Sequence, residues 1–134
     1  MTSVHAHDRT PHLEAGEVVW ANVLNPHQNP RCNNKPRPVI LLCRDGNGWL
    51  VMGLTTNHVY AQGTPRLRIS DPAALGLRGP SFLWGRPTRI CSIDIRDHAG
   101  WVDEPTATTL AAHLPGQCTL DALLGRSSDL TTAA

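Results

Sequence analysis

The sequence predicts a predominantly β domain of the α+β class, a small barrel with short helices at its C-terminal end. Short apolar runs rich in β-branched residues alternate with turn residues through most of the chain, whereas helical spacing of apolar residues begins only near Pro105. A length of 134 residues suits one hydrophobic core but not two. We therefore expect one domain over residues 15–125, with flexible tails at residues 1–14 and 126–134.

The first strand is expected at Gly16–Val23, which opens with a turn residue and continues with β-branched and aromatic residues. The next segment, Asn25–Pro36, reads NPHQNPRCNNKP and contains three prolines and four asparagines. These residues break or turn the chain too often for a regular element. The segment is therefore predicted to be a loop, and its length is typical of loops that carry function.

A buried hairpin is expected next. Two apolar runs, Pro38–Cys43 and Trp49–Leu54, flank the turn sequence Asp45–Gly48, which reads DGNG. Further along the chain, Ser81–Trp84 and Arg89–Asp94 have the composition of two more short strands. These segments supply the remaining walls of the predicted barrel.

Helical structure is expected mainly at the C-terminal end. Residues 71–76 allow at most one helical turn. Ala107, Leu110 and Leu114 recur at helical spacing behind a cap supplied by Asp103 or Glu104. A second short helix is predicted after a threonine cap at residue 119 and ends before the glycine at 125.

Composition restricts the classes of function. The chain has no apolar run near the length of about 20 residues that spans a bilayer, and its first residues lack the apolar centre of a secretory signal, so we expect a cytoplasmic protein with no membrane partner. A formal net charge of +1 argues against a clamp that binds nucleic acid by charge alone. Eleven of the twelve basic residues are arginines, whose planar forks suit phosphate.

Cysteines and histidines give no metal motif. The four cysteines contain no CxxC pair and are interpreted as free thiols: Cys32, Cys43, Cys91 and Cys118. Three histidines stand in the N-terminal tail, but no cluster of cysteines or carboxylates completes a site there. We therefore predict neither a metal nor another cofactor.

Three short motifs occur in order along the chain. They read GEVVW at residues 16–20, KPRPVIL at 35–41 and LTT at 54–56. Their order and spacing resemble the PemK/MazF family of ribonuclease toxins over about residues 16–100. The resemblance implies an SH3-like barrel and the toxin of a type II toxin–antitoxin system, a metal-independent, sequence-selective endoribonuclease that cleaves single-stranded RNA. It also implies a homodimer and a cognate antitoxin as partners, with no binding to DNA by the toxin itself.

The family motifs indicate which side chains would act in catalysis. Arg37 matches the family arginine, and a guanidinium stabilises the extra charge of the transition state. Thr55 is expected to bond a phosphate oxygen or position the 2′-hydroxyl with support from Thr56, although a strand-end threonine often bonds its own backbone instead. For proton transfer, His27 and His58 are the candidates because histidine titrates near neutral pH. His98 and His113 are interpreted as lying too far away.

Other polar residues are expected to extend a phosphate-binding track around the catalytic arginine. They are Arg31, Lys35, Arg86 and Arg89, with Asn57 available to read exposed base edges. The alternative is that these side chains only keep loops soluble. The strand tryptophans are expected in the core, so base stacking is not predicted.

The sequence also departs from the family pattern. The loop between the first strand and Arg37 lacks the family's glycine and glutamate, and Gly85-Arg86 stands where an acidic residue is usual. Asp94 or Asp97 would have to replace that carboxylate in space. The alternative function is therefore a catalytically inactive RNA-binding or protein-interaction barrel of the same fold.

Overall fold

A computed structural model describes residues 13–23, 36–59, 63 and 65–125 of this chain. Most of the predicted loop at Asn25–Pro36 lies outside the described residues, as do all of the predicted C-terminal tail and most of the N-terminal one. Among the described residues, no helix is long and apolar enough to cross a membrane.

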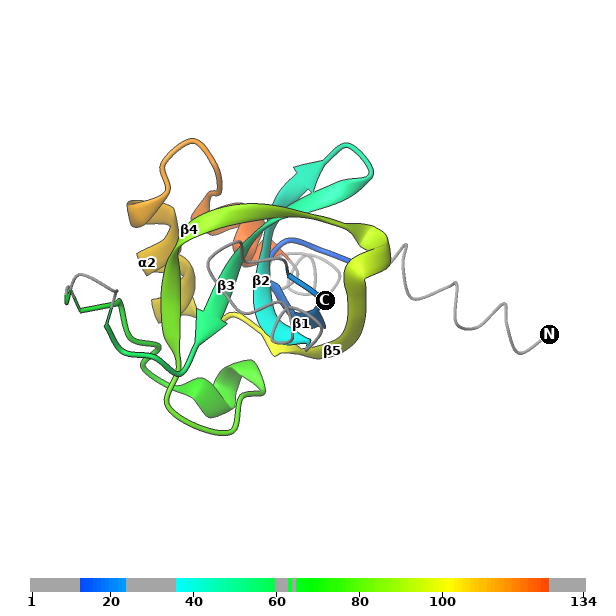
Figure 1. The fold of residues 1–134 in the computed structure, drawn as a ribbon. Coiled ribbons are helices and arrows are strands. Elements are labelled where there is room, and N and C mark those ends of the chain that lie inside the picture. The colour runs from blue at the N-terminus through cyan, green and yellow to red at the C-terminus, as the bar shows by residue number, and fades with distance from the viewer. Residues whose placement is uncertain (1–12, 24–35, 60–62, 64, 126–134) are drawn as a thin grey trace, which may run out of the picture.

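The fold is one antiparallel sheet of five strands with short helices beside it (Figure 1), which confirms the predominantly β, α+β class. The spatial order is β4-β3-β2-β1-β5, so four consecutive strands form a meander and the fifth returns beside the first. The strands are β1 (Glu17–Ala21), β2 (Arg37–Asp45), β3 (Gly48–Thr55), β4 (Phe82–Cys91) and β5 (Ile95–Trp101). The predicted hairpin is confirmed, with Gly46 at φ 62° in its turn, a conformation that favours glycine.

The sheet is strongly curved. In Figure 1, β4 arches over the sheet and turns directly into β5 through the short 3₁₀ helix η4 (Ser92–Asp94). Register shifts interrupt the ladders between β1 and β5, β2 and β3, and β3 and β4. Such bulges bend a strand and increase its twist, which accounts for the curvature.

The prediction of two separate strands at Ser81–Trp84 and Arg89–Asp94 was wrong. Phe82–Cys91 is a single strand of ten residues that runs through Gly85 and Pro87. The ladder to β3 shifts between Met52 and Leu54, opposite these two residues, and Gly85 has φ 110°. A bulge tolerates both a glycine and a residue without an N–H donor, so the two breakers do not end the strand.

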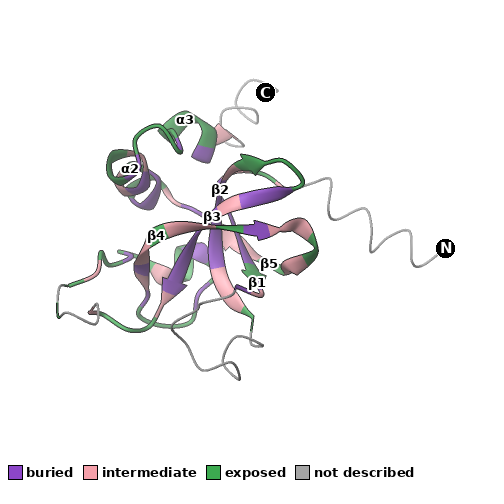
Figure 2. Ribbon diagram, turned by 45° about the horizontal axis from the view of Figure 1, so that its top comes forward, coloured by how far each residue is buried: buried purple, intermediate pink, exposed green. Residues whose placement is uncertain are grey.

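Apolar side chains form one cluster on each face of the sheet, because successive strand residues point to opposite sides. In β1, Val18 belongs to one cluster and Val19 to the other. The first cluster includes Leu110 and Leu123 from the helices, and Figure 2 shows the buried strands in the centre with the exposed sides of the helices outside. The second contains Trp49, which is 3% exposed.

Helices begin where their capping residues predict. Besides η3 (Pro72–Leu75), the structure has α2 (Glu104–His113) and α3 (Leu120–Leu123). The Asp103 side chain accepts a bond from the Thr106 N–H at 3.1 Å, and the Thr119 hydroxyl accepts one from the Ala122 N–H at 3.1 Å. Both predicted caps are confirmed.

Candidate functional site

Two of the predicted catalytic side chains lie opposite each other at one end of the sheet. The last pair of the β2–β3 ladder is Val39 with Gly53, and the same antiparallel register continued by two residues places Arg37 opposite Thr55. The two residues also line the same two hollows. Residues directly opposite one another share a face, with Cβ atoms about 5 Å apart. Arg37 begins β2 and Thr55 ends β3, so the Arg37–Thr55 pair stands where the sheet opens to solvent.

Two hollows border this pair. The small pocket has a volume of about 40 Å³, and the large hollow has a volume of about 800 Å³. Both are lined by Arg37, Leu54 and Thr55. The small pocket is completed by Val23, Val39, Gly53 and Trp84, and the large hollow by Trp20, Pro36, Pro38, Thr56, His98, Ala99 and residues 76–81. The pair therefore stands at the junction of two cavities.

The large hollow is apolar and cationic. Its walls include Pro36, Pro38 and Pro80, and its charged side chains are Arg37 and Arg78. No carboxylate occurs among the described residues that line it. This combination suits an anion that also carries apolar surface. Arg78 was not predicted as a site residue, because nothing in the local sequence distinguishes it from an ordinary loop arginine.

A local turn holds the threonine of the pair. The Thr55 hydroxyl accepts a hydrogen bond from the Asn57 N–H at 3.1 Å, and the Asn57 side-chain oxygen accepts one from the Val59 N–H at 3.2 Å. The alternative expected for Thr55, a hydrogen bond to nearby backbone, is thus present, but the Thr55 hydroxyl only accepts in it. A hydroxyl that accepts one bond can still donate its own proton. Thr56 lines the large hollow beside it.

Trp20 corrects the expectation that the strand tryptophans lie in the core. Trp49 does, but Trp20 is 36% exposed and lines the large hollow. It shares a face of β1 with Val18, which is fully buried, but lies further along the strand, where its cross-strand neighbours are Pro38 and Asp97. The apolar cluster on that face does not extend to Trp20, so the indole faces the hollow.

The histidines are arranged differently from the prediction. His58 is exposed, and its ring centroid lies 6.2 Å from that of Phe82, the residue opposite Thr55. His98 was expected to be distant, yet it borders the large hollow. Its Nδ1 lies 2.7 Å from Oε2 of Glu17, a buried carboxylate. The position of His98 at the large hollow could not be predicted from sequence spacing, because β5 reaches the site only by pairing with β1.

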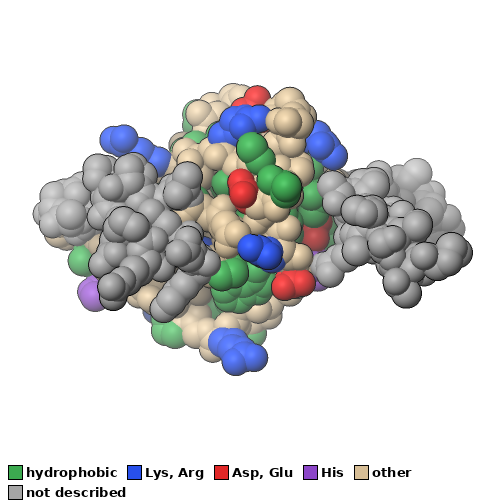
Figure 3. Space-filling model, turned by 45° about the vertical axis from the view of Figure 1, so that its right-hand side comes forward, with side chains coloured by type: hydrophobic (Ala, Val, Ile, Leu, Met, Phe, Trp, Pro, Cys, Tyr) green, Lys and Arg blue, Asp and Glu red, His purple; other side chains and the backbone are tan. Residues whose placement is uncertain are grey.

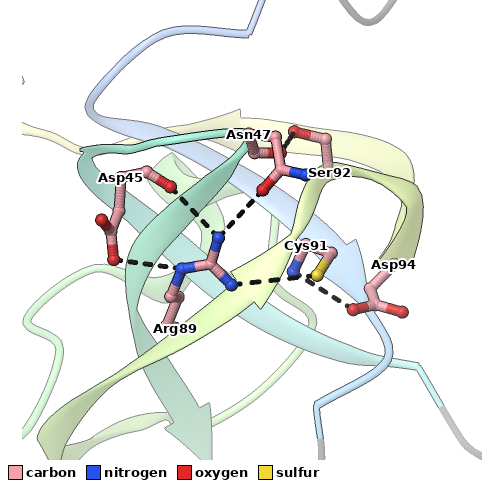
Figure 4. A network of polar contacts seen from close by, with 6 residues as sticks. All are labelled: Asp45, Asn47, Arg89, Cys91, Ser92 and Asp94. Atoms are coloured by element: carbon pink, nitrogen blue, oxygen red, sulfur yellow. Dashed lines mark hydrogen bonds and ion pairs between the residues drawn. The ribbon is translucent and has the colours of Figure 1, made fainter.

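The predicted phosphate track is not continuous around Arg37. Arg89 lies at the far end of the hairpin, where its guanidinium contacts Asp45 Oδ2 at 3.1 Å and Asn47 Oδ1 at 2.9 Å (Figure 4). Asp45 and Arg37 are opposite ends of a nine-residue strand, about 26 Å apart if the strand is straight. Arg86 is exposed on β4 and lines neither hollow.

The remaining predicted residues have varied outcomes. Asn57 belongs to the turn beside Thr55 but lines neither hollow. His27, Arg31 and Lys35 lie outside the described residues.

On the face seen in Figure 3, arginine side chains are set apart, with acidic and hydrophobic groups between them. The described part of that face has no single basic surface.

Of the two carboxylates considered as replacements for the missing acidic residue, only one is near the site. Asp94 accepts a bond from the Cys91 N–H at 3.2 Å and caps η4 (Figure 4). Asp97 lies directly opposite Trp20 in the β1–β5 ladder. Asp97 is therefore the nearer of the two along the sheet, although it does not line either hollow.

No model of a known protein family matches this chain, and no curated protein matches it.

Proposed function

We propose that this protein is a metal-independent endoribonuclease that cleaves single-stranded RNA at selected sequences, built on an SH3-like barrel of the PemK/MazF type. In the cell it would act as the toxin of a type II toxin–antitoxin system, as a homodimer neutralised by its cognate antitoxin. The observation that carries the proposal is the Arg37–Thr55 pair, which stands at the junction of two hollows, the larger of them cationic and without a described carboxylate.

In the proposed reaction the 2′-oxygen of one nucleotide attacks the adjoining phosphorus while the bond to the 5′-oxygen breaks. A base takes the 2′-hydroxyl proton, and an acid gives a proton to the leaving oxygen. The products are a 2′,3′-cyclic phosphate and a 5′-hydroxyl end. Arg37 donates to two phosphate oxygens and Thr55 donates its hydroxyl proton to one, so both stabilise charge that grows in the transition state.

For proton transfer we assign His58 as the first candidate. It follows Thr55 by three residues, and the Asn57 turn holds the connecting backbone. The backbone carbonyl of His58 also accepts a hydrogen bond from the Arg66 N–H at 2.9 Å, which holds the segment against a neighbouring loop. Contact with Phe82 keeps the ring near the strand end that carries Thr55. His98 is the second candidate, since its Nδ1 bond to Glu17 leaves Nε2 available.

The decisive experiment is cleavage of a long mixed-sequence RNA in chelator, with analysis of the product ends. Wild type is expected to give 2′,3′-cyclic phosphate ends. Arg37→Ala is expected to lose about 100-fold or more in rate, because transition-state donors have effects of this size. Arg86→Ala is the matched control: it removes an exposed arginine outside both hollows and should cleave at the wild-type rate.

The alternative function is a barrel that binds RNA without cutting it. It is favoured by one observation, since no carboxylate occurs among the described residues of either hollow. RNA that remains intact, with binding retained, would support this alternative and contradict the nuclease. Equal cleavage by wild type and Arg37→Ala would instead remove the assigned site.

A further inference from the structure

We propose that the indole of Trp20 is a stacking platform for the nucleobase next to the phosphate held by the Arg37–Thr55 pair. The large hollow would then be a nucleoside subsite, and Trp20 would determine part of the substrate specificity. This inference rests on the proposed function and adds to it a residue that reads the base rather than the backbone.

Exposure distinguishes Trp20 from the rest of the apolar side chains. It is one of four large hydrophobic side chains that are exposed among the described residues. The others are Leu67, Ile93 and Leu120, and none of them lines either hollow beside the Arg37–Thr55 pair. Trp20 belongs to neither core cluster, and more than a third of it is exposed beside a cationic site. Base stacking on such a ring is a common means of holding single-stranded nucleic acid.

Trp20 also lies at the right distance from the catalytic arginine. Its partner in β2 is Pro38, the residue that follows Arg37. One strand spacing and one residue step therefore separate Trp20 from Arg37, about 6 Å between Cα atoms. Trp20 shares a face of the sheet with Pro38, so the Arg37 side chain leaves the sheet on the opposite face. Both residues line the large hollow, which is where a ligand can contact the two side chains together. A phosphate at the guanidinium and a base at the indole would belong to the same or adjoining nucleotides.

The walls of the large hollow suit a base and its phosphates. Proline rings at Pro36, Pro38 and Pro80 give rigid apolar surface in the same hollow as the indole, as a base face requires. Arg78 adds a second cation to the lining, available to the next phosphate along the strand. A base can enter this hollow only when unpaired, so the subsite selects single-stranded RNA.

Part of the hollow is held rigidly by close backbone packing. A Cβ atom on Gly76 would lie 2.1 Å from the Ala99 carbonyl oxygen, and one on Gly100 would lie 2.4 Å from the Leu75 carbonyl oxygen. The backbone after η3 thus packs directly on β5, and both segments line or adjoin the large hollow. This wall is fixed before any ligand binds, which lowers the entropy cost of binding.

The test measures binding without cleavage. The probe is a 2′-O-methyl oligonucleotide with the mapped cleavage sequence, which lacks the attacking hydroxyl, together with a copy made abasic at the two nucleotides that flank the scissile phosphate. Trp20→Ala is expected to weaken binding of the intact probe about tenfold or more, the range for loss of one base–aromatic stack. The abasic copy should bind wild type and Trp20→Ala equally, and Trp20→Phe should retain most of the affinity.

Leu67→Ala is the matched control, because Leu67 is 43% exposed but lies outside the large hollow, and it should bind as wild type does. Thermal unfolding checks that each variant is folded, and light scattering checks its mass. Wild-type affinity in Trp20→Ala, an equal loss on both probes, or a changed mass would overturn the stacking role. Failure of the proposed function has a different readout, namely that wild type leaves the mixed-sequence RNA uncut, whether or not it binds the RNA.

Discussion

At the scale of single residues, Cys118 shows how burial sets the chemistry of a thiol. It is 7% exposed, and its thiol contacts the Leu110 carbonyl oxygen at 3.6 Å. Burial raises the pKa of Cys118 above its usual 9.0, and the negative charge that Cys43 can acquire raises it further. The folded state therefore holds this thiol neutral at pH values where the unfolded chain ionises.

This raised pKa predicts a loss of stability at alkaline pH. The contribution of Cys118 is fully present below the ordinary thiol pKa of 9.0 and is lost as pH rises toward the higher folded value. Unfolding free energy measured between pH 8 and 11 should fall, and the fall should be shallower in Cys118→Ala. Thiol alkylation of the native protein at pH 8 should modify Cys43 and Cys91 before Cys118. Fastest labelling at Cys118 would contradict its burial.

The pairing of Arg37 with Thr55 shows how far sequence could predict the site. The tight hairpin turn pairs Asp45 with Gly48, and counting back from it without interruption would place Arg37 opposite Thr56. A register shift between Leu41 and Cys43 moves the partner by one residue, to Thr55. A one-residue shift moves a side chain to the other face of a sheet. Motif matching found the two residues, but the bulge that makes them partners depends on packing.

At the scale of elements, the parts governed by local chemistry were predicted and those governed by distant pairing were not. The hairpin turn and the two helix caps follow from residues within four positions of each other. By contrast, β5 (IRDHAGW) has three consecutive exposed polar residues and no fully buried one, and it forms its ladder with β1, about 80 residues earlier. Its sequence has no strong strand signal, so the placement of His98 and Asp97 beside the site could not be predicted.

The contact between η3 and β5 gives a prediction at this scale. Gly76 ends η3 with φ 83°, and an added Cβ would meet the Ala99 carbonyl oxygen at 2.1 Å. Gly116 has nearly the same φ, 85°, but an added Cβ would have nothing within 4 Å. Gly116→Ala should therefore cost only the strain of a left-handed residue, about 1–2 kcal/mol.

Gly76→Ala carries the same strain and a clash with backbone, so it should cost at least about 2 kcal/mol more than Gly116→Ala. Denaturant unfolding of the two variants beside wild type measures the difference. Since the clash lies in the wall of the large hollow, RNA binding by Gly76→Ala should also weaken. Similar stability of the two variants would show that η3 is not packed closely against β5.

At the scale of the whole molecule, the charge distribution limits how RNA can be bound. The formal net charge is +1, and the basic groups seen in Figure 3 are dispersed. A protein of this kind gains little from long-range attraction to a polyanion. If the protein has the proposed function, its affinity for RNA would then come from a few phosphate contacts inside the large hollow together with contacts to bases.

This balance predicts a shallow dependence of RNA affinity on salt. Each phosphate neutralised on single-stranded nucleic acid contributes a slope of about −0.7 in a plot of log affinity against log salt. Arg37 and Arg78, the two arginines of the described lining, should together give about −1.4, and the basic residues outside the described range can add to that. Titration of the 2′-O-methyl oligonucleotide from low to high salt measures the slope.

Arg37→Ala and Arg78→Ala should each reduce the magnitude of this slope by about 0.7. Trp20→Ala should lower affinity at every salt concentration and leave the slope unchanged. A wild-type slope steeper than about −5 would mean that a broad basic surface, rather than the hollow, binds the RNA.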